Sequence, residues 1–378
     1  MKEKATQRLA SLDVLRGFDL FCLVGLEGIL HPLARAVDKP WFDRLMWNFS
    51  HVEWEGFSPW DLVMPLFLFM SGVSIPFAMQ RYREGAEKSA FYRRILKRVA
   101  LLWVFGMMCQ GNLLGLNPDR IYLFSNTLQS IAVGYLVAAL LYVHTSWRVQ
   151  LAVGAGFLLS YWGLMHGVEV QGYGGGQYTP DANLAEWIDR MVLGRFRDGA
   201  YVENGKVVFA PWYRYTWILS SVNFAVTVMT GVWAGMWLRA SRINASRKAL
   251  LLCVAGVAMV AAGWLWHPLL PVIKKIWTSS MVLVSSGYCL LLMGVVYYLV
   301  DCRGYRRGTG WLRVYGMNSI AAYMMAQCVN FRSLSTSWSY GLEQYVGDFY
   351  PALVATSNSV ILYIVLWMMY KKGIFLKV

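Results

Sequence analysis

The residues of this chain that are best suited to acid–base chemistry lie between residues 50 and 61. His51 is followed by Glu53 and Glu55, and Asp61 lies ten residues after the histidine. A histidine beside carboxylates is suited to general-base or nucleophilic work near neutral pH. An ordinary surface histidine fits the same pattern equally well. The spacing therefore makes His51 a candidate catalytic residue without excluding a structural one.

Asp61 also has two interpretations. Ser58 is a favourable residue for capping a helix, and Pro59 suits the first helical position. Asp61 then falls in the first turn, where the helix dipole stabilises a negative charge. This explains Asp61 without a catalytic role, yet its spacing from His51 also fits a partner of the histidine.

A second group of ionisable residues lies inside an apolar run at residues 12–31. Asp13 and Arg16 are three residues apart and share one helical face, so they can neutralise one another, and Asp19 follows one turn later. Glu27 has no basic residue within a helical turn, which suits a proton-accepting group near His51. A side chain that reaches the membrane interface explains Glu27 as well. Ionisable groups within a membrane span mark functional sites by default.

The elements that must position these residues are membrane helices. The 378 residues are 57% hydrophobic and 15% charged, with a mean hydropathy of +0.41. Soluble domains are about 45–50% apolar and about 25% charged. A net charge of +14 would suggest nucleic acid in a soluble protein, but here the basic residues lie between long apolar runs. The composition therefore predicts a polytopic membrane protein and excludes nucleic-acid binding.

The predicted fold is an all-α bundle of about ten membrane helices that forms a single domain over residues 1–378. The loop at 167–214 is the longest, and it is too short for a soluble domain, so we expect an extracytoplasmic loop or small cap. Each span needs about 20 apolar residues. The predicted spans are 12–31, 59–79, 99–116, 127–143, 149–166, 215–238, 249–266, 279–300, 314–330 and 353–370.

The distribution of charge predicts the orientation. With both termini inside, the inside segments hold 22 basic and four acidic residues, and the outside segments hold 12 basic and 13 acidic residues. Cytoplasmic loops carry an excess of Lys and Arg, so both termini are expected to be cytoplasmic. The inside basic residues include clusters at 2–8, 81–98, 239–248, 303–313 and 371–377.

The cysteines and the remaining histidines point to no metal site. The six cysteines are scattered without ligand spacing, and no histidine has another at i+3 or i+4. His31, His144, His166 and His267 each lie at a span end, where amphipathic side chains collect. We therefore predict no metal cofactor.

Several short motifs, in order along nearly the whole chain, resemble the heparan-α-glucosaminide N-acetyltransferase family of transmembrane acyltransferases. Each motif is weak alone, but together they are specific. They are Leu12-Asp-Val-Leu-Arg-Gly17, His51-x-x-Trp54-x-Gly56, Asp61-Leu-Val-Met-Pro65, Leu128-Gln129, Ile188-Asp-Arg-Met-Val-Leu-Gly194, Lys275-Ile-Trp277-Thr-Ser279, Gly316-Met-Asn318-Ser-Ile320 and Tyr370-Lys-Lys-Gly-Ile-Phe375.

The resemblance implies transfer of an acetyl group from cytosolic acetyl-CoA to a glucosamine-like amino sugar on the far side of the membrane. It also implies that His51 is the catalytic histidine and that the protein is a homodimer. Animal members of the family carry asparagine at the position of Glu27 and arginine at that of Ser130, so the acceptor sugar can differ. The large luminal domain of those members has no counterpart, which suits a bacterial inner-membrane protein.

On this basis we assign candidate roles. His51, Glu27 and Asp61 are candidate catalytic residues, and Glu53, Trp54 and Asn318 are candidate substrate contacts, with Asn318 able to donate to the thioester oxyanion. Arginine and lysine on the inner side suit the phosphates of acetyl-CoA. The candidate acetyl-CoA contacts are Arg16, Arg94, Lys97, Arg98, Gln129, Lys275, Trp277 and Ser279.

Two mechanisms and one rival function stay open. His51 either carries the acetyl group itself or acts as a base on the acceptor amine while both substrates are bound. The rival is a proton-coupled amino-sugar transporter that uses the intramembrane carboxylates. Many transporters are built from inverted repeats, and the second half of the sequence does not repeat the first-half motifs. A structural or scaffolding role fits the polar groups in the spans least well.

Overall fold

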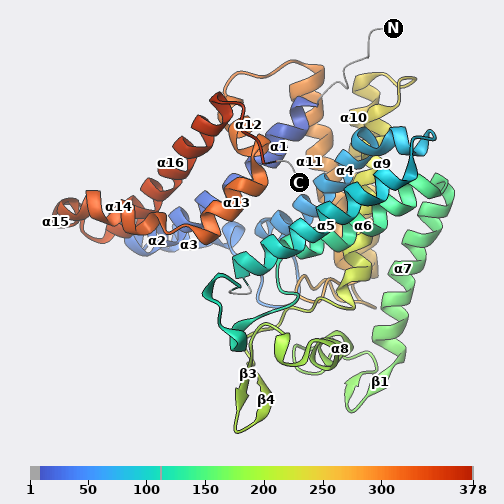
Figure 1. The fold of residues 1–378 in the computed structure, drawn as a ribbon, viewed down its shortest axis with the longest axis horizontal. Helices are drawn as coiled ribbons and strands as arrows, with labels where there is room; N and C mark the ends of the chain where they lie inside the picture. The colour runs from blue at the N-terminus through green and yellow to red at the C-terminus, as the bar shows by residue number, and fades with distance from the viewer. Residues whose placement is uncertain (1–8, 111–112, 377–378) are drawn as a thin grey trace. The chain divides into compact units, whose positions relative to one another are not determined.

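The computed structural model describes residues 9–110 and 113–376, so the basic cluster at 2–8 and Lys377 lie outside the described residues. The chain is mostly helical, as predicted (Figure 1). It divides into two compact units. The terminal unit contains the described residues of Met1–Val52, Ser58–Val63 and Val295–Lys377, and the central unit contains Glu53–Phe57 and Met64–Gly294.

The terminal unit begins with a long helix that contains a π-helical turn. α1 (Ala10–Phe21), the π turn Cys22–Leu26 and α2 (Glu27–Val37) are continuous, and α3 (Pro40–Met46) and the 3-10 turns Trp47–Phe49 and Pro59–Leu62 follow. The rest of this unit comes from the C-terminal part of the chain. It comprises the π turn Tyr298–Cys302, α12 (Gly310–Met317), α13 (Ser319–Cys328), α14 (Phe331–Ser339), α15 (Glu343–Val346), 3-10 turns at Tyr340–Leu342 and Gly347–Phe349, and α16 (Tyr350–Lys371).

Two glycines allow α1 and α12 to approach closely in the terminal unit. A Cβ atom at Gly17 would lie 1.8 Å from the carbonyl oxygen of Leu312, and one at Gly316 would lie 2.0 Å from that of Asp13. Small residues at such contacts let membrane helices pack backbone against backbone. The glycines of the Leu12–Gly17 and Gly316–Ile320 motifs therefore have a packing role.

The central unit contains the other long helices. They are α4 (Val63–Arg83), whose first residue belongs to the terminal unit, α5 (Lys88–Gln110), α6 (Thr127–His144), α7 (Trp147–Gly167), α9 (Ser220–Arg239), α10 (Ala245–Trp266) and α11 (Ser279–Tyr297), whose last turn also belongs to the terminal unit. α4 packs on α9 through Gly72 and Gly231, where added Cβ atoms would lie 1.9 and 2.0 Å from carbonyl oxygens of the facing helix.

The predicted extracytoplasmic loop forms a small folded cap in the central unit. It contains α8 (Leu184–Leu193) and two short antiparallel hairpins, β1 (Glu169–Val170) with β2 (Tyr173–Gly174), and β3 (Ala200–Glu203) with β4 (Lys206–Phe209). In the second hairpin Ala200 is paired with Phe209. Short 3-10 turns at Leu113–Gly115, Pro118–Arg120 and Gly194–Phe196 complete the unit.

Seven helical segments in the described parts of the chain are long and apolar enough to cross a membrane. They are Ala10–Val37, Pro59–Arg83, Thr127–His144, Ser220–Arg239, Ala245–Trp266, Ser279–Cys302 and Phe331–Lys371. The other three predicted spans also coincide with helices. Residues 99–116 overlap α5, whose first half is basic, 149–166 lie in α7, and 314–330 are divided between α12 and α13 at Asn318. The chain is thus a multi-pass membrane protein, and ten spans with cytoplasmic termini remain a prediction.

Candidate active site

His51 and Asp61 form a close pair in the terminal unit. His51 Nδ1 lies 2.8 Å from Asp61 Oδ1, which is hydrogen-bonding distance. The Asp61 side chain is 1% exposed and that of His51 is 38% exposed. The buried carboxylate therefore holds a histidine ring that is partly exposed.

The start of the helical segment that leads into α4 positions Asp61. Asp61 lies in the 3-10 turn Pro59–Leu62, which Ser58 caps in a capping box. Asp61 Oδ2 accepts hydrogen bonds from the backbone N–H groups of Ser58 (3.0 Å) and Val52 (3.4 Å). The Ser58 hydroxyl lies 2.6 Å from the carbonyl oxygen of Ser50 and 3.0 Å from Asp61 Oδ2, and its single proton is donated to one of them at a time.

The cap and the histidine therefore use different oxygens of the same carboxylate. Oδ2 closes the helix start, as the Ser58-Pro59 signal predicts, and Oδ1 faces His51. When Nδ1 donates its proton to this carboxylate, Nε2 is the basic atom of the ring. The same orienting role is played by the aspartate of a Ser-His-Asp triad. The pair can therefore act as an oriented base or nucleophile.

Glu27 is not the partner of His51 in this structure. It is the first residue of α2 and is half-buried. Among the residues that the structure describes, none forms a hydrogen bond or an ion pair with its carboxylate. The sequence offered two carboxylates for His51, and the geometry pairs the histidine with Asp61.

The segment Glu53–Phe57 belongs to the central unit and is fixed there by several polar contacts. Trp54 Nε1 donates to the carbonyl oxygen of Tyr178 (2.9 Å), and Gly56 N donates to that of Val272 (2.8 Å). Lys275 Nζ donates to the carbonyl oxygen of Glu53 (2.6 Å). Three predicted site residues, Glu53, Trp54 and Lys275, are thus brought together.

His267 also belongs to this cluster, although it was not predicted from the sequence. Its Nε2 lies 3.3 Å from Glu55 Oε1, and its Nδ1 accepts a hydrogen bond from the backbone N–H of Val272. The partners are 212 residues apart in the sequence, so no local spacing signals the pair. The only sequence signal was the carboxylate-rich segment itself.

Three further predicted site residues form hydrogen bonds within the central unit. Gln129 Oε1 accepts from the backbone N–H groups of Ser125 and Asn126, and its Nε2 donates to Leu123 O. Ser279 Oγ donates to the carbonyl oxygen of Leu158. Trp277 is buried in a left-handed conformation with φ of 51°. Its Nε1 donates to Thr227 Oγ1. All three were predicted as acetyl-CoA contacts, and in this structure their polar atoms bind other protein groups.

Asn318 has a comparable role in the terminal unit. Its Nδ2 donates to the carbonyl oxygen of Ile374 (3.0 Å), and its Oδ1 accepts from the backbone N–H of Leu376 (3.1 Å). The residue also separates α12 from α13. Both ends of the amide thus hold the C-terminal segment after α16.

The predicted acetyl-CoA arginines and lysine lie on α5 and α1. Arg94 and Lys97 are exposed on α5. The Arg98 guanidinium carbon lies 4.1 Å from the centre of the Tyr135 ring on α6, within the range of a cation–π interaction. The Nε atom of Arg98 is buried without a hydrogen-bond partner among the described residues. Arg16 is half-buried in α1.

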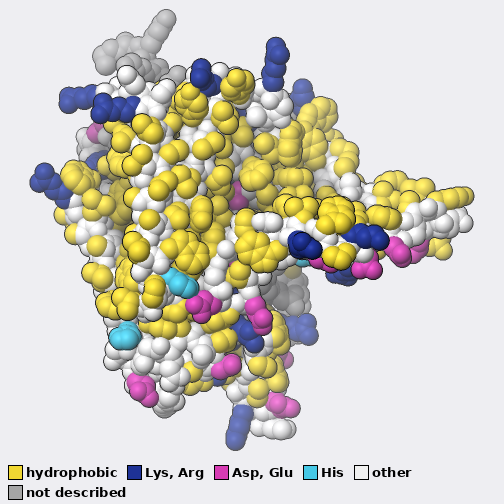
Figure 2. Space-filling model, turned by 180° about the vertical axis from the view of Figure 1, so that it is seen from behind, with side chains coloured by type: hydrophobic (Ala, Val, Ile, Leu, Met, Phe, Trp, Pro, Cys, Tyr) yellow, Lys and Arg dark blue, Asp and Glu magenta, His cyan; other side chains and the backbone are white. Residues whose placement is uncertain are grey.

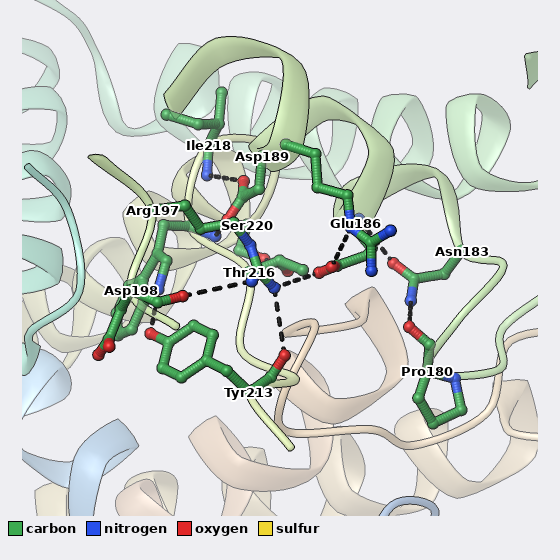
Figure 3. Close-up of polar contacts among 12 residues, drawn as sticks. Pro180, Asn183, Glu186, Asp189, Arg197, Asp198, Tyr213, Thr216, Ile218 and Ser220 are labelled. Atoms are coloured by element: carbon green, nitrogen blue, oxygen red, sulfur yellow. Dashed lines mark hydrogen bonds and ion pairs between the residues drawn. The ribbon is translucent and has the colours of Figure 1, made fainter. Parts of the chain in front are cut away.

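A buried ionic network organises the cap (Figure 3). Glu186 on α8 accepts from Arg190 Nε (2.7 Å) through Oε1 and from Arg197 Nη2 (2.5 Å) through Oε2. Arg197 is fully buried, and it also donates to the carbonyl oxygen of Tyr213. Neither Glu186 nor Arg197 was a predicted site residue. Burial of one partner alone would be costly, so the network fixes the cap.

Asp189, in the Ile188–Gly194 motif, connects α8 to the start of α9. Its carboxylate accepts hydrogen bonds from the backbone N–H groups of Trp217 (2.8 Å) and Ile218 (2.9 Å). Burial raises the pKa of this carboxyl to about 7, although the two N–H groups and nearby Arg197 oppose the shift. The motif is therefore a structural connection between the cap and a long helix.

Comparison with known proteins supports the family indicated by the motifs. Residues 8–189 match the family model "Heparan-alpha-glucosaminide N-acetyltransferase, catalytic". The chain is similar to the heparan-alpha-glucosaminide N-acetyltransferase of Homo sapiens, with 27% identity over 84% of this chain and 52% of that protein. It is 23% identical to the mouse protein of the same name, over 100% of this chain and 61% of the mouse protein.

The matched part of each relative is therefore between half and two thirds of its length. The region matched by the family model contains His51, Asp61 and the Ile188-Asp189 part of the cap motif. The chain is therefore similar to the heparan-alpha-glucosaminide N-acetyltransferase family, as its motifs predicted.

Proposed function

We propose that this protein is a membrane acetyltransferase that moves the acetyl group of acetyl-CoA to the amine of a glucosamine-like sugar. The observation that carries the proposal is the 2.8 Å contact between Nδ1 of the partly exposed His51 ring and the buried Asp61 carboxylate. The names of the human and mouse relatives support the reaction class.

His51 would act through Nε2 in either of two ways. In the first, Nε2 attacks the thioester carbonyl, the C–S bond breaks, and the thiolate of CoA leaves. The amine then attacks acetyl-imidazole and releases His51. In the second, Nε2 removes a proton from the acceptor amine as the amine attacks the thioester carbonyl, the C–S bond breaks, and CoA leaves as its thiolate. In both routes Asp61 holds the ring and stabilises its positive charge.

We propose that acetyl-CoA approaches from the cytosol and the sugar from the opposite side. Arg94, Lys97 and Arg98 would bind the phosphates, because guanidinium and ammonium groups are strong phosphate ligands. Arg16 is a further candidate for this cation set, whereas Lys275 contacts the carbonyl oxygen of Glu53 and would meet acetyl-CoA on the acceptor side. Gln129, Trp277, Ser279 and Asn318 would position the backbone around the substrates, since their polar atoms already bind protein groups.

On the acceptor side, Glu53 and Trp54 are the proposed sugar contacts. The carboxylate of Glu53 is exposed and can recognise an ammonium group. Its Oε1 atom lies 3.8 Å from Arg214 Nη1. Glu27 remains a proposed proton acceptor in the span. The proposal places the protein in a bacterial inner membrane as a homodimer.

The test is acetyl-CoA turnover by purified protein. Release of free CoA on addition of glucosamine is expected for the wild type, and His51→Ala should lower it by roughly 10²-fold or more. His144→Ala is the matched control, because His144 contacts Tyr92 through Nε2 and has no carboxylate partner in the described contacts. Absence of acetyl-CoA binding and turnover, with glucosamine counterflow in vesicles, would instead establish a transporter.

Mass spectrometry of the protein after exposure to acetyl-CoA alone separates the two routes. A mass increase of one acetyl group that is lost on addition of glucosamine indicates the acetyl-histidine route. An unmodified protein that still turns over with both substrates indicates direct transfer.

A further inference from the structure

A cavity of about 480 Å³ opens in the terminal unit between α2, α14 and α16. α2 lines it with Gly28, Pro32 and Arg35, and α16 lines it with Pro351, Ala355 and Asn358. Both sets follow the spacing i, i+4, i+7, which places them on one face of each helix. The cavity is thus a groove that follows the two helices for about two turns.

The charged residues of this groove lie at one end. Arg35 is in the last turn of α2, Arg332 is near the start of α14, and Asp348 lies two residues before α16. None of these three side chains forms a hydrogen bond or an ion pair with another described residue. Two guanidinium groups and one carboxylate are therefore available to the same ligand.

The other end of the groove is lined mostly by small and apolar residues. A Cβ atom at Gly28 would meet no atom within 4 Å, so this position opens into the groove. Ser335 Oγ donates to Asn358 Oδ1 (2.6 Å). The Nδ2 atom of Asn358 forms no hydrogen bond with another described residue. The amide is thus held with its donor group available.

The lengths of the helices place the charged end of the groove near the surface of a bilayer and the apolar end deeper. The continuous segment Ala10–Val37 has 28 residues, or about 42 Å at 1.5 Å per residue, whereas the hydrocarbon layer is about 30 Å thick. Arg35 lies at its end and Gly28 two turns deeper. In α16 the order runs from Pro351 at the helix start to Asn358 two turns deeper. The charged end therefore suits the headgroup level, and the apolar end suits the hydrocarbon.

α14 supports this placement because its faces are reversed relative to those of a helix on a soluble protein. Its buried face carries Ser335 and Ser339, whereas Trp338 on the outer face is 57% exposed. Tyr345 of the neighbouring α15 is 80% exposed. Figure 2 shows hydrophobic side chains along one side of the α14–α15 region and charged ones along the other. Trp and Tyr are typical of the membrane–water interface.

We propose that this groove binds a membrane phospholipid whose headgroup carries a phosphate and a primary ammonium, the chemistry of phosphatidylethanolamine. Arg35 and Arg332 bind the phosphate, and Asp348 accepts hydrogen bonds from the ammonium. Asn358 Nδ2 donates to an ester carbonyl, and the start of an acyl chain lies along Gly28.

The first test is native mass spectrometry of the full chain titrated with phosphatidylethanolamine, phosphatidylglycerol and phosphatidylcholine of identical acyl chains. Phosphatidylethanolamine should bind most tightly. Phosphatidylglycerol has no ammonium, and phosphatidylcholine has no N–H donor. The double variant Arg35→Gln/Arg332→Gln should bind phosphatidylethanolamine about 25-fold more weakly, at about fivefold per basic residue. Equal binding of the three lipids, or an unchanged double variant, would overturn the proposal.

Asp348→Asn tests the headgroup assignment by a change in preference. Loss of the carboxylate should remove the advantage of phosphatidylethanolamine and favour phosphatidylglycerol, because only the two arginines then remain. If Arg35→Gln/Arg332→Gln has the melting temperature of the wild type, its weaker lipid binding reflects the loss of ligand contacts and not of the fold. An unchanged order of lipid preference in Asp348→Asn would refute the role of this residue.

Gly28→Leu tests the acyl part of the groove. The leucine fills open space and should weaken lipid binding, whereas Gly163→Leu on α7, also with no atom within 4 Å of the added Cβ, should not. Soluble O-phosphoethanolamine distinguishes a lipid from a free amino phosphate. It should not displace the lipid at equal concentration, and equal displacement would exclude the lipid as the ligand.

Discussion

Asp61 illustrates how one residue can satisfy a structural rule and a chemical one together. Helix capping alone explains Asp61 from the sequence, and the structure confirms that cap. It also brings the second oxygen of the carboxylate to His51 Nδ1. The helix start therefore fixes the position of the group that orients the histidine, so that folding of this turn and orientation of the ring are linked.

Asp61→Asn separates the two roles. The amide can keep its oxygen toward the cap, but it then presents Nδ2 to His51 and favours the tautomer in which Nε2 carries the proton. Turnover should fall by roughly 10²-fold, with a much smaller change in melting temperature. Asp61→Ala should lower both, because the cap is lost as well. Equal turnover in Asp61→Asn and the wild type would show that the pair is only structural.

At the scale of elements, a tightly packed glycine and an open one should respond to alanine with opposite changes in stability. Gly17→Ala places a Cβ 1.8 Å from a backbone oxygen of α12, so α1 and α12 must separate. Gly163→Ala meets open space and gains helix propensity of up to about 1 kcal/mol. Thermal unfolding in detergent should show a lower midpoint for Gly17→Ala and an unchanged or higher one for Gly163→Ala. The reverse order would contradict close packing of the two helices.

The buried Asp189 of the cap predicts a pH dependence of the protein's stability. Its pKa of about 7 in the fold exceeds the ordinary value of 3.8, so the folded state binds the proton more tightly than the unfolded state does. The contribution of Asp189 to stability should therefore fall as the pH rises from about 4 to about 7, and then stay constant. Asp189→Asn should remove this part of the pH dependence of the melting temperature.

Asp181→Asn is the control for this measurement. Asp181 is an exposed carboxylate in the same cap, and no described residue forms a hydrogen bond or an ion pair with it. Its substitution should leave the pH profile parallel to that of the wild type. Parallel profiles for both variants would show that Asp189 does not titrate in this interval.

The same elements show how far the sequence could predict the structure. The start of the helical segment at Ser58-Pro59 and most spans were predictable because their signals are local. Contacts such as Asp189 with Trp217 and Glu55 with His267 depend on segments that only folding brings together. The break at Asn318 was also missed, because the run on both sides is apolar and only the contacts with Ile374 and Leu376 explain it.

At the scale of the whole molecule, the charge distribution predicts which side of the membrane each loop faces. The 22 basic residues assigned to the inside exceed the acidic ones there by 18. Two exposed turns test the assignment, Gly85 between α4 and α5 and Gly205 between β3 and β4. Alkaline phosphatase, which is active only outside the cytoplasm, should be active when inserted at Gly205 and inactive at Gly85.

A fluorescent protein that matures only in the cytoplasm gives the complementary result, and it should be bright at Gly85 and after the C-terminus. Phosphatase activity at Gly85 would show that the orientation is opposite to the predicted one. The α5 basic residues would then lie on the side away from cytosolic acetyl-CoA. The proposed reaction would then need a different donor or a different phosphate site. The orientation of the chain is thus a condition for assigning Arg94, Lys97 and Arg98 to CoA.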